Sequence, residues 1–73
     1  MSDWSEEAEE YVGWIVRDLQ VQGGPVDREA VRSVLAGAKG EGLDWQRIYR
    51  EAVRLAAEMW GVTAPPLEEV TPV

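Results

Sequence analysis

The segment from residue 44 to residue 60 constrains the fold more than any other part of the chain. With about 100° between successive residues of a helix, its apolar side chains fall in one arc of roughly 160°. The members of this arc are Trp45, Ile48, Tyr49, Ala52, Val53, Leu55, Ala56, Met59 and Trp60. A helix on the surface of a bundle needs an apolar stripe only a little wider than about 100°. This helix is therefore expected to lie between two neighbours of its own chain or to leave apolar surface for another chain.

Two further segments have the apolar periodicity of helices, at residues 4–22 and 28–39. Acidic residues fill the first turns of the earlier segment, where the helix dipole favours negative charge. Asp27 and Asp44 precede the two later helices and are suitable N-cap residues. Gly61 follows the last helix and is a suitable C-cap.

The sequence predicts an all-α fold, a small three-helix bundle with helices at about 4–22, 28–39 and 44–60. Residues 1–62 are expected to form a single helical domain, since a chain of 73 residues has room for only one core. Residues 63–73 contain three prolines and are predicted to be an extended or disordered tail.

The composition argues against an enzyme. The chain has neither cysteine nor histidine, so thiolate metal ligands and the commonest general base are both missing. Ser33 has no recognisable catalytic partner, and we expect no catalytic residue, no cofactor and no metal site. No apolar run is long enough for a membrane span, and the acidic N-terminus is unlike a secretory signal. These features predict a cytoplasmic protein that does not enter membranes.

The net charge of -7 is unevenly distributed. Residues 1–26 carry six acidic residues and one basic residue, whereas residues 27–58 are balanced. Such a field repels nucleic acid and favours a partner protein with a basic surface. Alternatively, the acidic residues are a solvated helix start and nothing more.

Two groups of residues are predicted to bind protein partners. On the first helix, Trp14 and Val21 lie outside the core stripe with Glu7 and Glu10 beside them, an arrangement typical of an apolar anchor with a polar rim. The other interpretation places Trp14 in the core. On the last helix, the candidates are Trp45, Tyr49, Val53 and Trp60.

Self-association is the simplest way to cover the wide apolar face of the last helix. A two-fold contact between copies of that helix would bury the same set of residues on each copy. The small side chains of Ala52 and Ala56 would allow the two helix backbones to approach closely. We therefore expect a homo-oligomer, most simply a dimer, that acts as an acidic interaction or regulatory module.

An alternative interpretation is a helix-turn-helix regulator that binds nucleic acid. Arg47, Arg50 and Arg54 share one face of the last helix, as phosphate contacts would require. Glu51 and Glu58 interrupt this face, and the rest of the chain is acidic. Both features make nucleic-acid binding the weaker hypothesis.

Overall fold

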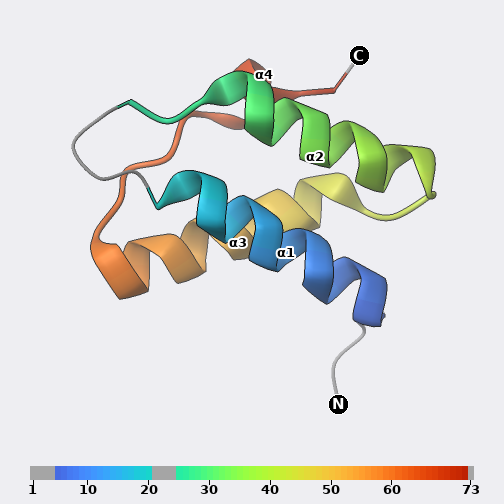
Figure 1. Cartoon of the computed structure of the whole chain (residues 1–73), viewed down its shortest axis with the longest axis horizontal. Helices are drawn as coiled ribbons and strands as arrows, with labels where there is room; N and C mark the ends of the chain where they lie inside the picture. The colour runs from blue at the N-terminus through green and yellow to red at the C-terminus, as the bar shows by residue number, and fades with distance from the viewer. Residues whose placement is uncertain (1–4, 21–24, 73) are drawn as a thin grey trace.

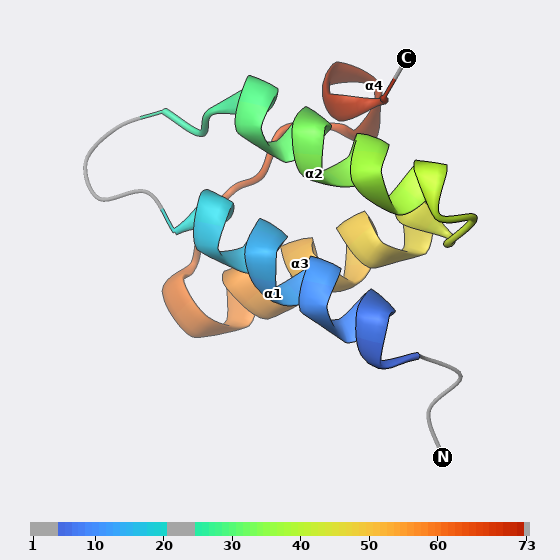
Figure 2. The same cartoon turned by 45° about the vertical axis from the view of Figure 1, so that its right-hand side comes forward.

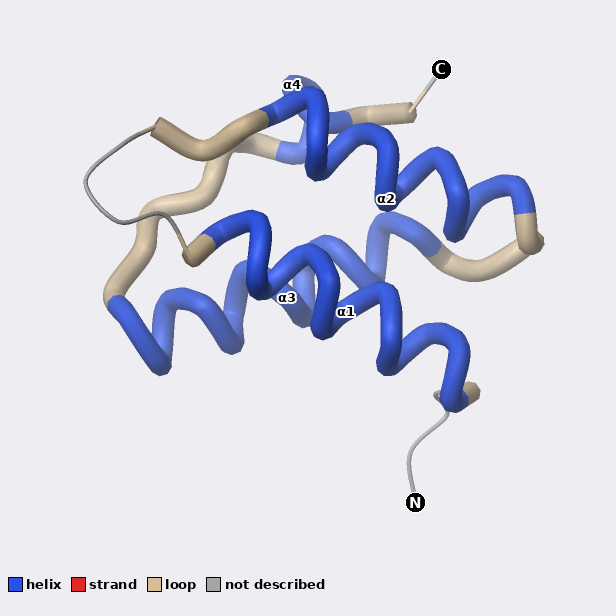
Figure 3. Tube along the Cα trace, in the orientation of Figure 1, coloured by secondary structure: helices blue, strands red, loops and turns tan. Residues whose placement is uncertain are grey.

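The computed structural model describes residues 5–20 and 25–72, most of which are helical (Figure 1). In chain order the helices are α1 (Glu6–Leu19), α2 (Arg28–Gly40), α3 (Trp45–Trp60) and α4 (Leu67–Val70). The described ranges contain helices and loops but no strand (Figure 3). The prediction of an all-α fold is thereby confirmed for this part of the chain.

Side-chain caps fix where the three long helices begin. The Ser5 hydroxyl oxygen accepts a hydrogen bond from the Ala8 backbone N–H at 3.1 Å, and the Asp27 and Asp44 carboxylates cap α2 and α3 in the same way. Such a bond satisfies one of the N–H groups that a helix start leaves without a partner. Gly61 ends α3 with φ 66°, a left-handed conformation that glycine adopts without strain.

The first helix is shorter than the predicted span of 4–22. It ends at Leu19, whose side chain is fully buried, and the Gln20 backbone N–H caps it by donating to the carbonyls of Val16 and Arg17. The chain leaves the helix directly after this last core residue. Residue 4 and residues 21–22 lie outside the described residues.

The helices pack in two levels. In Figure 1, α1 crosses in front of α3, and α2 lies above both, an arrangement that the turned view in Figure 2 repeats. All four helices contribute to one core, whose buried apolar residues are Ala8, Val12, Ile15, Leu19, Val31, Leu35, Ala38, Ile48, Tyr49, Ala52, Ala56 and Val70.

The C-terminal segment differs from the predicted extended or disordered tail of residues 63–73. It contains the short helix α4, which packs against α2 and places Val70 fully inside the core. An ion pair joins Arg28 to Glu69, and an Arg32 guanidinium N–H donates to the Glu69 carbonyl at 2.7 Å. The proline-containing segment is thus part of the packed structure, because its apolar residues cover surface that α2 and α3 would otherwise expose.

Candidate functional site

The apolar arc of α3 is covered in part by the chain's own C-terminal segment. Tyr49 is only 3% exposed, and its hydroxyl donates a hydrogen bond to the Pro65 carbonyl. Burial is the main cause that raises the pKa of Tyr49 above its ordinary value. The prediction that Tyr49 contributes to a partner-binding surface is therefore wrong, because the segment after α3 already occupies that side of the helix.

The middle of the same arc is also packed within the chain. Trp45 and Val53 are half-buried against the core, and Ala52 and Ala56 are fully buried. The two alanines therefore cannot provide the close approach between two copies of α3 that the sequence suggested. Of the four α3 residues predicted to bind a partner, Trp60 alone is exposed.

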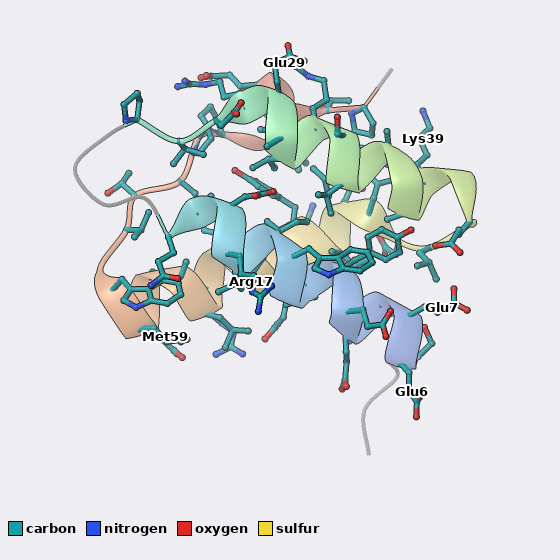
Figure 4. The ribbon with its side chains drawn as sticks, viewed as in Figure 1. Glu6, Glu7, Arg17, Glu29, Lys39 and Met59 are labelled. Carbon is teal, nitrogen blue, oxygen red and sulfur yellow. The ribbon has the colours of Figure 1, made fainter. Side chains whose placement is uncertain are left out.

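The exposed part of the arc is the last turn of α3. Trp60 is 39% exposed and its neighbour Met59 is 60% exposed. Figure 4 labels Met59 at this end of the helix, at the lower left of the view. Gly61 ends the helix immediately afterwards, and Met59 and Trp60 stay exposed before it. We call Met59 and Trp60 the α3 end.

A second exposed apolar residue, Trp14, lies on α1 in a defined contact. The residue is 46% exposed, and its ring meets the Tyr11 ring edge to face, with 5.0 Å between centroids and 83° between planes. The Tyr11 hydroxyl donates to the Glu41 carboxylate, which is the first cause that raises the pKa of Tyr11. Gly37 leaves room for Tyr11, since a Cβ there would lie 3.3 Å from its hydroxyl oxygen. Trp14 is thus exposed to solvent, and its ring is held in place by its contact with Tyr11.

The acidic residues predicted to surround Trp14 are exposed as well. Glu7 and Glu10 lie on α1, and both charges help to raise the pKa of Tyr11, which places them near that ring. Val21, the fourth member of the predicted group, lies outside the described residues. The partial exposure of Tyr11 was not predicted from the sequence, although a tyrosine at the edge of a core stripe commonly keeps its hydroxyl near water or a polar partner.

A groove of about 400 Å³ lies between α1 and α3, on residues that are not among the predicted partner-binding residues. Its apolar lining consists of Val12, Gly13, Val16 and Leu55, and two carboxylates, Glu9 and Glu51, stand beside them. Among the described residues, a Cβ added at Gly13 would meet no atom within 4 Å apart from its immediate neighbours and its own helix backbone. The helix crossing creates this groove, so no local sequence pattern could have revealed it.

The arginines of α3 do not form an unopposed basic face. Arg54 pairs with Glu51 and, at 3.1 Å, with Glu58, and these bonds raise the pKa of Arg54. Arg47 and Arg50 are both exposed on the same helix. Because two carboxylates compete for one of the three guanidinium groups, this arrangement favours a solvated ion-pair face over a nucleic-acid contact.

Within residues 5–20 and 25–72, no group of three or more carboxylates is placed to hold a metal ion. In the same ranges, no helix has the length and apolar character that crossing a membrane requires. Comparisons with protein-family models, with curated proteins and with solved structures returned no match.

The open space at Gly13 leads to a stability prediction. We expect Gly13→Ala to raise the free energy of unfolding by about 0.5–1 kcal/mol. Alanine has less conformational freedom than glycine in the unfolded chain, and its methyl group would contact no other described segment in the folded one. Gly37→Ala is the control, since its methyl group would press on Tyr11 and offset the same gain. Urea unfolding followed by circular dichroism measures both, and a destabilised Gly13→Ala variant would show that the groove is not open.

Proposed function

We propose that this chain is a small, acidic, non-catalytic protein-interaction module that self-associates through the α3 end. The observation that carries the proposal is the exposure of the neighbouring residues Met59 and Trp60, in a chain whose other large apolar residues on α3 are buried or half-buried. Tryptophan and methionine are enriched in protein interfaces relative to other surface. Without histidine or cysteine, the chain has few groups suited to catalysis.

A two-fold contact between two α3 ends fits this patch. In such a contact the same residues meet from both copies, so each Trp60 ring could cover the Met59 or Trp60 side chain of the other chain. The patch is small compared with the roughly 1,000 Å² of a stable interface, so weak and reversible dimerisation is expected. This differs from the contact along all of α3 that the sequence predicted.

The α1 surface supports a second class of protein partner. Trp14 provides an apolar anchor in a supported position, and Glu7 and Glu10 add negative charge beside it. A basic protein surface would match this arrangement, because complementary charges around an aromatic anchor promote both encounter and orientation.

Light scattering over a range of protein concentrations tests self-association. We expect the mean mass to rise from monomer towards dimer as concentration increases, and to rise further at moderate salt. Salt screens the repulsion between two chains that each carry a net charge of -7. A monomer at every concentration and salt condition would contradict the proposed self-association.

A further inference from the structure

The groove between α1 and α3 has the chemistry of a binding site for a side chain of another protein. Val12, Val16 and Leu55 provide an apolar lining, and Gly13 leaves its middle without a side chain. A helix-interior glycine costs roughly 1 kcal/mol relative to alanine, and no contact among residues 5–20 and 25–72 requires one at this position. An aliphatic side chain entering from outside would fill the space that this glycine leaves.

The charge around the groove identifies the kind of partner. Glu9 stands on the α1 side and Glu51 on the α3 side. The Arg54 guanidinium is shared between Glu51 and Glu58, so these two carboxylates together retain a net negative charge. Figure 4 shows Glu6 and Glu7 at the first turns of α1 and Arg17 in its last turn, so the negative charge lies towards the N-terminal end of the groove. A partner with basic residues beside its apolar side chain would therefore be attracted and oriented here.

We propose that this groove binds an amphipathic helix of a basic partner protein. One aliphatic side chain of that helix would pack against Gly13, and lysine or arginine residues one turn away would approach Glu9 and Glu51. Such helix-in-groove binding presents apolar anchors at i, i+3 or i+4 spacing. The inference rests on the proposed role as a protein-interaction module, but it uses a different surface from the α3 end.

A second copy of the chain fits the groove poorly. A two-fold contact there would bring Glu9 and Glu51 of both copies together, and each copy carries a net charge of -7. Like charges placed across an interface oppose association. The basic helix is therefore the better occupant of the groove.

An NMR titration with two designed helical peptides tests this inference. Both peptides carry leucines along one face, and the other positions hold lysine in one peptide and glutamate in the other. We expect the lysine peptide to shift the amide signals of Gly13, Val16 and Leu55 in a saturable way. Salt should weaken this binding, whereas it should strengthen self-association.

Two leucine variants provide a matched comparison. Gly13→Leu fills the groove and is expected to weaken binding of the lysine peptide at least tenfold. Gly40→Leu is the control, because a Cβ at Gly40 also has no atom of another described segment within 4 Å but lies outside the groove at the end of α2. Circular dichroism of both variants verifies that each still folds.

Three results would overturn the inference. They are equal binding to the wild type and Gly13→Leu, shifts confined to the acidic residues of α1, and absence of lysine-peptide binding. If the wild type still dimerises in light scattering, the proposed function stands and the groove assignment alone fails. If the lysine peptide binds in the groove but the chain stays monomeric, self-association through the α3 end fails and the groove assignment stands.

Discussion

Val70→Asp is expected to lower the free energy of unfolding by about 3 kcal/mol or more. Val70 is fully buried where α4 packs against α2, so the substitution removes a buried aliphatic side chain and places a carboxylate in the core. Loss of a buried valine costs about 1.5–3 kcal/mol, and an unpaired buried charge adds to this. A chain this small has a total stability of only about 5 kcal/mol, so unfolding near physiological temperature is expected.

Thr71→Asp is the matched control for this prediction. Thr71 is the next residue and is exposed, and its hydroxyl donates to the Leu67 carbonyl at 2.9 Å. Losing that bond should cost about 1 kcal/mol at most. Urea unfolding followed by circular dichroism compares the two variants. Similar unfolding midpoints for Val70→Asp and the wild type would show that the C-terminal segment is not packed as the structure has it.

Replacing both residues of the α3 end, as Met59→Ser and Trp60→Ser together, is expected to raise the dimer dissociation constant at least tenfold. Each two-fold contact contains both residues twice, so the double variant removes four apolar side chains from one small interface. Sedimentation equilibrium of the variant and the wild type measures the change. The stability of the monomer should fall much less than in Val70→Asp, because both side chains are already exposed.

Trp14→Ser is the control for that double variant. It removes an equally exposed tryptophan from a different surface, so it should leave the dimer dissociation constant close to the wild-type value. If Trp14→Ser weakens dimerisation and the double variant does not, the self-association contact lies on α1 instead of α3.

The parts of the fold that depend on local chemistry were predictable from the sequence. Asp27 and Asp44 cap their helices as expected, because a carboxylate before an apolar periodic segment can accept hydrogen bonds from the first free N–H groups. Gly61 ends α3 for an equally local reason. The exposure of Trp14 and Trp60 also agrees with their selection as surface candidates.

The parts that depend on packing were not predictable. The prolines after α3 indicate an extended segment, but no local pattern shows that Val70 fills a gap beside α2 or that Pro65 accepts a hydrogen bond from Tyr49. The width of the α3 arc predicts that neighbours in the same chain or another chain cover it, and it does not show which. In the structure the chain's own C-terminal segment covers Tyr49, whereas Trp60 stays exposed.

The groove between α1 and α3 also depends on packing and was not predictable from either helix alone. On α1 alone, Gly13 is a helix-interior glycine with no evident purpose, and on α3 alone, Leu55 is one more member of an apolar arc. Only the crossing of the two helices places them on one open groove. A surface made by two distant segments carries no sequence signature of its own.

The most direct test of self-association through the α3 end is the NMR methyl signal of Met59, followed over a series of protein concentrations. Met59 is the more exposed residue of the α3 end, so its methyl environment must change when a second chain covers it. We predict a progressive shift of this signal as dimers form, while the Gly40 amide signal at the end of α2 stays in place. A Met59 signal that stays fixed over the whole concentration series would contradict the proposed contact.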